Sequence, residues 1–152
     1  MRYYLDTEFN GFGGQLLSLA LVREDGESMY WVSSHNCDQH WDGWVLQNVV
    51  PLYHECPVEA DMATPLPQQI MNLMDGDGEP VIVTDWPDDI RYFCQAIITG
   101  PGQMIPLPDG LEFELRRVDA YPTTLPGAVQ HNAWWDAMAL RHMLIGAPHD
   151  QR

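Results

Sequence analysis

Three strand-like segments follow one another at the start of the chain, and they constrain its fold more than any other feature. Residues 2–6, 15–24 and 28–34 are rich in leucine, valine and aromatic side chains, and the third segment alternates apolar and polar residues. Asp25-Gly26 is a hairpin signal between the second and third segments. The sequence therefore predicts an antiparallel three-strand meander.

The rest of the chain alternates between helix and strand patterns. Apolar residues at helical spacing predict helices over residues 41–50, 66–75, 87–98 and 132–145. The β-branched run at 81–83 predicts a buried strand over 80–85, and a weaker alternation predicts another over 111–120. Residues 51–66 carry three prolines and residues 100–110 carry prolines and glycines, and both stretches are predicted to be loops. We expect an α/β protein in which helices flank a mixed sheet, with one domain covering residues 1–152.

The charge of the chain is strongly negative. Its formal net charge is −15, and all seven basic residues are arginine. Such a surface repels nucleic acid at long range, which argues against a protein that binds duplex DNA. It fits an acidic interaction protein, or an enzyme whose carboxylates hold metal ions. Acidic residues also simply increase solubility.

Neither a membrane span nor a secretory signal is predicted. The chain has no apolar run of about 18 residues, and its start, MRYYLDTE, lacks the long apolar core of a signal peptide. We therefore expect a cytoplasmic protein that has no membrane partner.

Cysteine and histidine residues raise one alternative metal site. Cys37-x2-His40 and His54-x-Cys56 supply four ligands of the kind that bind zinc. The second pair is more closely spaced than in the usual zinc pattern, and cysteine is often buried without a metal. Zinc binding is therefore the weaker interpretation.

Two acids end the first predicted strand. Asp6 and Glu8 are two positions apart, so a strand directs both side chains to the same face. Buried carboxylates that lie so close repel each other, and a divalent metal ion removes that repulsion. Taken alone, the pair is weak evidence, because acids at strand ends are often only structural.

Two further acidic clusters follow. Asp85 ends the strand over 80–85, and Asp89 lies in the first turn of the next helix, where acids are also ordinary partners of the helix dipole. His131 and Asp136 would point apart on one helix, but they converge if His131 lies in the loop before it. An imidazole beside carboxylates is a natural general base, whereas the plain alternative is a surface histidine and a capping aspartate.

Together these clusters resemble a known family. The DTE of the first strand, an acid after the fourth strand, and H-x4-D before the last helix resemble the DEDDh 3′–5′ exonucleases, which have an RNase H-like fold. Within that superfamily the chain is most similar to the RNase AS-type 3′–5′ exoribonucleases. MRYYLDTEF, LLSLALV, EDG and HNAWWDAMAL carry this similarity, which spans nearly the whole chain.

The resemblance implies roles for individual residues. It implies that two divalent ions, Mg²⁺ with Mn²⁺ as a substitute, are held by four acids, and that a histidine is the general base; these residues are Asp6, Glu8, Asp89, Asp136 and His131. Asp85 stands where relatives often have asparagine, and it is a second candidate for the third ligand. Thr7 and Phe9 flank the acids where the family contacts the terminal nucleotide, although Phe9 fits the core equally well.

The expected function is therefore two-metal 3′–5′ hydrolysis of single-stranded nucleic acid, with RNA favoured over DNA. The resemblance also implies a homodimer and adenine-rich RNA as substrate. Trp134 and Trp135 are adjacent, so at most one of them easily faces the core, and the other is free to face substrate or a partner subunit. The alternative is an inactive RNase H-like binding protein or an acidic mimic of nucleic acid, which the net charge of −15 would suit.

Overall fold

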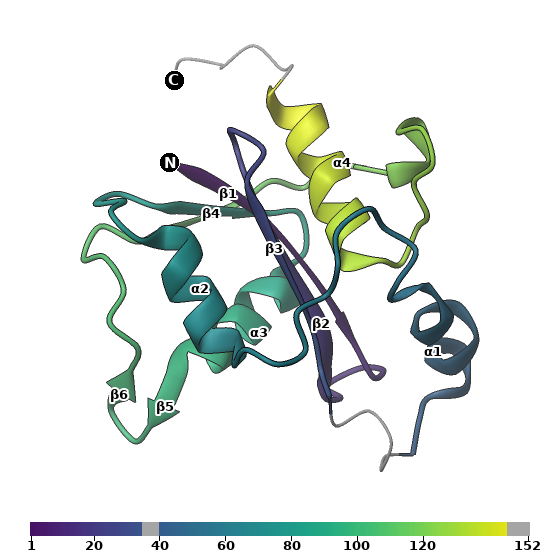
Figure 1. Cartoon of the computed structure of the whole chain (residues 1–152), viewed down its shortest axis with the longest axis horizontal. Helices are drawn as coiled ribbons and strands as arrows, with labels where there is room; N and C mark the ends of the chain where they lie inside the picture. Colours follow the sequence, from purple (N-terminus) through teal and green to yellow (C-terminus); the bar gives the residue numbers. More distant parts are fainter. Residues whose placement is uncertain (35–39, 146–152) are drawn as a thin grey trace.

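The computed structural model describes residues 1–34 and 40–145, and it is built around one five-stranded sheet with the strand order β3-β2-β1-β4-β7 (Figure 1). The strands of this sheet are β1 (Arg2–Phe9), β2 (Leu16–Arg23), β3 (Ser28–Val32), β4 (Val81–Thr84) and β7 (Glu112–Leu115). The helices are α1 (Gly43–Asn48), α2 (Leu66–Met74), α3 (Pro87–Ile97) and α4 (Ala133–Ile145). Short 3-10 helices cover Val50–Leu52 and Pro122–Thr124.

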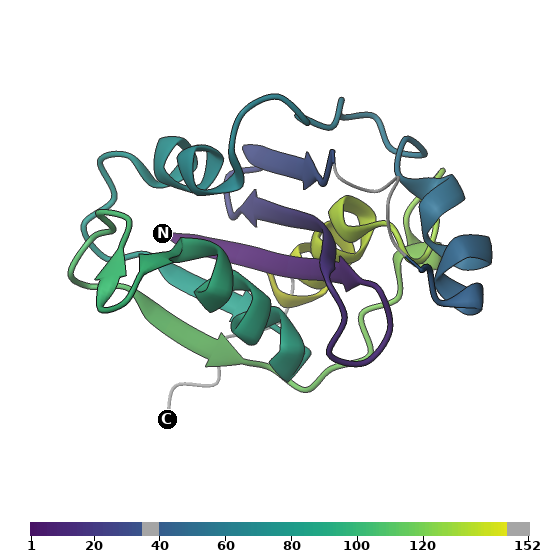
Figure 2. The same ribbon diagram turned by 90° about the horizontal axis from the view of Figure 1, so that it is seen from below.

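The sheet is mixed, with β1 at its centre (Figure 2). β1 pairs antiparallel with β2 and parallel with β4, so that Tyr4 lies opposite Val22 on one side and Val83 on the other. β3 pairs antiparallel with β2, and β7 pairs parallel with β4. The predicted α/β class and the mixed sheet flanked by helices are confirmed, and this arrangement is compatible with an RNase H-like fold.

Alternate residues of β1 face two separate cores. Tyr3 and Leu5 pack in a cluster that includes residues of α2 and α3, such as Ile70 and Phe93. Tyr4 packs on the other face against Leu140 of α4. Helices therefore cover both faces of the sheet, as Figure 1 shows, and β1 is buried between them.

Several element boundaries differ from the prediction. β1 continues to Phe9, beyond the predicted end at residue 6, because β2 still pairs with it there. Gly43 begins α1, since the side chain of Asp42 accepts hydrogen bonds from the N–H groups of Trp44 and Val45 and caps the helix. Of the predicted strand over 111–120, only β7 pairs with the sheet.

The predicted loop at 100–110 is wrong in its first part. Strands β5 (Ile98–Gly100) and β6 (Gln103–Met104) pair antiparallel in a small second sheet. Pro101 and Gly102 make the turn between them, and Gly102 has a φ of 66°, which glycine adopts without strain. Among the described residues, no helix is both long enough and apolar enough to cross a membrane.

Candidate metal centre

Five acids gather where β1 and β4 end. These strands are parallel, and Tyr4 lies opposite Val83, so the same register brings Asp6 and Asp85 to one edge of the sheet. Glu8 lies further along β1, while Asp89 and Asp136 lie in the first turns of α3 and α4. The order of the strands, rather than the spacing in the sequence, therefore brings the acids together.

The acids form two groups that share one member. Ligand oxygens of Asp6, Glu8 and Asp136 all lie within 4.8 Å of one another, and so do those of Asp6, Asp85 and Asp89. Carboxylate oxygens are the hard ligands that Mg²⁺, Mn²⁺ and Ca²⁺ prefer. These groups could therefore bind metal ions, with Asp6 positioned to contact an ion in each.

The surroundings of these acids disfavour their ionised form. Burial, reinforced by the neighbouring carboxylates, raises the pKa of Asp6 and of Glu8 well above the ordinary range. Burial also raises the pKa of Asp89 to about 7 and that of Asp136 to about 7. Divalent cations would offset both the lost hydration and the repulsion, so this donor set fits metal ions.

Two threonines hold Asp89, which is only 2% exposed. The backbone N–H and the hydroxyl of Thr7 donate to its Oδ1 at 3.1 and 2.6 Å, and the hydroxyl of Thr84 donates to its Oδ2 at 2.6 Å. Thr7 was expected to contact substrate, yet both of its donor groups bond to Asp89 inside the protein. Its position indicates that it orients this acid.

Asp85, which belongs to the group with Asp6 and Asp89, is half-buried. Burial raises the pKa of its carboxyl group, while the nearby guanidinium of Arg117 lowers it. Because both Asp85 and Asp89 have an oxygen within reach of Asp6, each of them is a candidate ligand.

Asn132 anchors the start of α4. It was predicted to be the first helical residue, but it caps the helix instead: its Oδ1 accepts from the N–H groups of Trp134 and Trp135 at 3.1 and 3.2 Å. Its Nδ2 donates to the carbonyl of Leu52 at 2.7 Å. This buried residue fixes the helix end that carries Asp136, and the cap-forming residue type before an apolar run was the available signal.

His131 lies in the loop before α4, as the prediction required for it to approach Asp136. Its φ of 64° places it in the left-handed region, and its ring makes an edge contact with Trp44 at a centroid distance of 4.9 Å. Burial lowers the pKa of the imidazole. The backbone N–H of His131 lowers the pKa of Asp136, but the imidazole belongs to neither acidic group.

The remaining aromatic candidates mainly pack inside the protein. Phe9 is half-buried and stacks on Tyr92, with 4.7 Å between ring centroids. Trp134 is buried and donates its indole N–H to Ser28 Oγ at 3.0 Å. Trp135 packs against Trp134 and donates to the carbonyl of Glu55 at 2.8 Å. Internal contacts therefore hold all three rings in place.

A cavity of about 220 Å³ opens beside the acids. Asp6, Asp85 and Asp136 line it together with side chains that were not predicted as site residues, namely Trp86, Arg117, Tyr121 and Gln130. The sequence did offer one reason to consider Arg117: basic residues are rare in this chain, which has a net charge of −15, seven arginines and no lysine.

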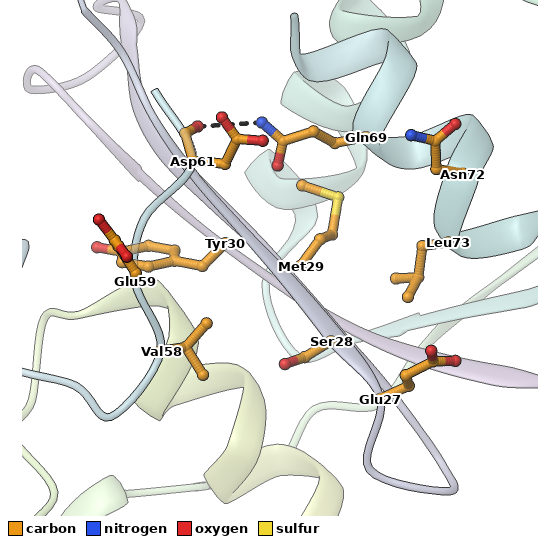
Figure 3. Close-up of a pocket in the computed structure, with 10 residues that line it drawn as sticks. All are labelled: Glu27, Ser28, Met29, Tyr30, Val58, Glu59, Asp61, Gln69, Asn72 and Leu73. Atoms are coloured by element: carbon orange, nitrogen blue, oxygen red, sulfur yellow. Dashed lines mark hydrogen bonds between the residues drawn. The ribbon is translucent and has the colours of Figure 1, made fainter. Parts of the chain in front are cut away.

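A second cavity, of about 350 Å³, lies elsewhere, between β3, α2 and residues 58–61 (Figure 3). In the described part of the chain, its charged lining residues are Glu27, Glu59 and Asp61. Asp61 already accepts from the N–H groups of Ala63 and Thr64, and its carbonyl accepts from Gln69, as Figure 3 shows. None of the predicted site residues lines this cavity. Cys37, which the zinc alternative requires, lies outside the described residues.

Comparison with known proteins finds one local similarity. No family model matches the chain. Two curated proteins named 3′–5′ exoribonuclease, from two strains of Mycobacterium tuberculosis, are each 40% identical to it over 53 residues, which are 34% of this chain and 32% of theirs. The match thus spans about a third of the length of these curated relatives. It points to a nuclease.

Proposed function

We propose that the protein is a metal-dependent 3′–5′ exonuclease of the DEDDh type that removes nucleotides from single strands, preferring RNA to DNA. The local similarity to two proteins named 3′–5′ exoribonuclease supports this proposal. The observation that carries it is the shared position of Asp6 in two groups of acids, which suits a pair of Mg²⁺ ions bound side by side. Asp6, Glu8 and Asp136 would hold one ion, and Asp6 with Asp89 or Asp85 the other.

Such ions stabilise the negative charge that develops when a phosphodiester is attacked and cleaved. The protein supplies the remaining parts. The imidazole of His131 accepts a proton from the attacking water, and its lowered pKa keeps it neutral at physiological pH, as a base must be. The contact with Trp44 restricts the orientation of the ring.

Positioning residues surround these groups. Thr7 and Thr84 fix the carboxylate of Asp89, and Asn132 fixes the turn that carries Asp136. Hydrogen bonds from such outer residues orient ligands and tune their basicity. The alternative function, an inactive binding protein or an acidic mimic, would not need two acidic groups whose carboxyl pKa values are raised by burial.

Digestion of end-labelled strands tests the proposal. The protein is incubated with single-stranded RNA and DNA of matched sequence, labelled at either end, in Mg²⁺, in Mn²⁺ and in EDTA. We expect stepwise shortening from the 3′ end that requires the metal and is faster on RNA. Asp6→Asn and His131→Ala should abolish it, whereas Asp109→Asn and His142→Ala, which change exposed residues outside the site, should not. Cleavage by the first two variants at the wild-type rate would refute the assignment.

A further inference from the structure

We propose that Trp86, Arg117 and Arg91 form the track on which the strand lies as it enters the metal centre, with a base stacked on Trp86 and phosphates beside the two arginines. This inference rests on the proposed exonuclease function and concerns the nucleotides that precede the one being removed.

The register of the sheet places Arg117 against Trp86. Thr84 of β4 lies opposite Leu115 of β7, and two residues further along each parallel strand stand Trp86 and Arg117. The guanidinium of Arg117 lies over the indole, 4.7 Å from the ring centroid, and its Nη1 donates to the carbonyl of Asp85 at 3.0 Å. The indole N–H donates to Asp88 at 3.3 Å. The ring is thus held in place while it remains 50% exposed.

Two adjoining hollows make the track continuous. Trp86 and Arg117 line the cavity of about 220 Å³ that contains Asp6 and Asp136. The same two side chains also line an adjoining, more open hollow of about 520 Å³, together with Pro87, Asp88 and Arg91. A chain leaving the acids would therefore cross the indole and reach Arg91.

The charge of Arg117 is the one best suited to an external anion. Within residues 1–34 and 40–145, four arginines form ion pairs with carboxylates, namely Arg2, Arg23, Arg91 and Arg116. Arg141 donates to the carbonyls of Arg23 and Glu24. Arg117 is exposed, and in that part of the chain it forms no ion pair with a carboxylate. In so acidic a protein, this leaves a local positive charge beside the acids.

A single strand of nucleic acid has the chemistry that this surface would bind. Each nucleotide offers a flat base that stacks on an indole and a phosphate that pairs with a guanidinium. Both contacts tolerate any sequence, as an enzyme that shortens a strand step by step requires. The positive charge also offsets the repulsion between the phosphates and the acidic surface.

Substrates of two lengths distinguish the contribution of the track from that of the metal centre. Cleavage of an RNA dinucleotide and an RNA dodecanucleotide is measured with the wild type, Trp86→Ala and Arg117→Gln. We expect each variant to raise KM for the dodecanucleotide about tenfold, because a lost stacking or ionic contact has that effect. The kcat/KM for the dinucleotide should fall by a smaller factor than the kcat/KM for the dodecanucleotide, because the dinucleotide is too short to extend along the track.

Binding is measured separately through the fluorescence anisotropy of a labelled dodecanucleotide without added metal ion, where no cleavage is expected. The slope of log affinity against log salt should become shallower by about 0.7 for Arg117→Gln, the value for one phosphate contact on a single strand. Arg116→Gln is the matched control, since this neighbouring exposed arginine pairs with Glu114 and lines neither hollow. Trp86→Phe keeps an aromatic face and should restore most of the affinity.

The outcomes distinguish the two proposals. Wild-type protein that binds the dodecanucleotide through Arg117 but cleaves neither substrate would support the track and overturn the exonuclease function. Wild-type cleavage of both substrates with unchanged variants would overturn the track alone. Variants that lose activity equally on both lengths would also overturn it, because Trp86 and Arg117 would then act by positioning Asp85.

Discussion

Thr7 and Asp89 are 82 positions apart in the sequence, yet the Thr7 hydroxyl donates to Oδ1 of Asp89 at 2.6 Å and its backbone N–H donates at 3.1 Å. The bond joins the central strand β1 to the first turn of α3. Asp89 in turn has a carboxylate oxygen within 4.8 Å of Asp6, whose side chain leaves β1 on the face opposite to that of Thr7. The site therefore depends on side chains from both faces of β1.

Loss of the Thr7 hydroxyl should weaken metal binding. Thr7→Val keeps the shape of the side chain but leaves Asp89 with one donor fewer in a buried site. We expect activity at limiting Mg²⁺ to fall about 10- to 100-fold, as for other outer ligands, with partial recovery at high Mg²⁺. Thr99→Val, at an exposed threonine of β5, is the control. Unchanged metal dependence would show that the hydroxyl does not orient the ligand.

The stability of the metal-free protein should fall as pH rises. Asp89 and Asp136 have pKa values of about 7 in the folded protein, against about 4 for an unfolded aspartate. The folded state therefore binds more protons between these values, so the free energy of unfolding decreases from about pH 4 to about pH 7. Urea denaturation in EDTA measures this decrease.

Added Mn²⁺ should reverse that pH dependence. The cation competes with protons for the same carboxylates, so it stabilises the folded protein more at pH 8 than at pH 5. A stability that rises with pH in EDTA would contradict the burial of these acids.

Asp6→Asn should separate stability from function. Replacing this carboxylate removes a buried charge that repels its neighbours, so the metal-free variant should be more stable than the wild type at pH 8. Because Asp6 belongs to both acidic groups, calorimetric titration with Mn²⁺ should show loss of binding at both. Asp109→Asn, at an exposed acid outside these groups, should change neither property. Metal binding equal to that of the wild type would exclude Asp6 as a shared ligand.

Substitutions at His131 should distinguish backbone strain from chemistry. Its φ of 64° is costly for a side chain with a Cβ, so His131→Gly should be more stable than His131→Ala by about 1 kcal/mol. Thermal denaturation measures that difference. Both variants lack the imidazole and should fail to cleave, even though the glycine variant folds at least as well. Cleavage by His131→Gly would show that the imidazole is not the base.

Asn132→Ala should loosen the start of α4. The variant loses the helix cap and a partly buried hydrogen bond to the carbonyl of Leu52, which together should cost about 1–3 kcal/mol of unfolding free energy. The affinity for Mn²⁺ should fall as well, because Asp136 lies in that first turn. Asn72→Ala, on α2, removes an amide that accepts a hydrogen bond from Gln68 away from the acids, and it serves as the control. Normal Mn²⁺ affinity in Asn132→Ala would mean that the cap does not position Asp136.

Local patterns in the sequence determined most of the elements. The side chains that must be buried recur every second residue in a strand and every three to four residues in a helix. Such short-range patterns were enough to predict β1, β4, α2, α3 and α4. The shared face of Asp6 and Glu8 needed nothing more than the period of a strand. The placement of His131 before α4 followed in the same way from the geometry of a helix.

Only the tertiary structure determined which of the site residues lie close together. The choice of β4 as the parallel neighbour of β1 brings Asp85 and Asp89 to Asp6, and the register of β7 on β4 lays Arg117 over Trp86. Thr7 bonds to Asp89 of a distant helix, and the hairpin of β5 and β6 formed where a loop was expected. Strand order and register result from the packing of the whole core, so no local spacing in the sequence specifies them.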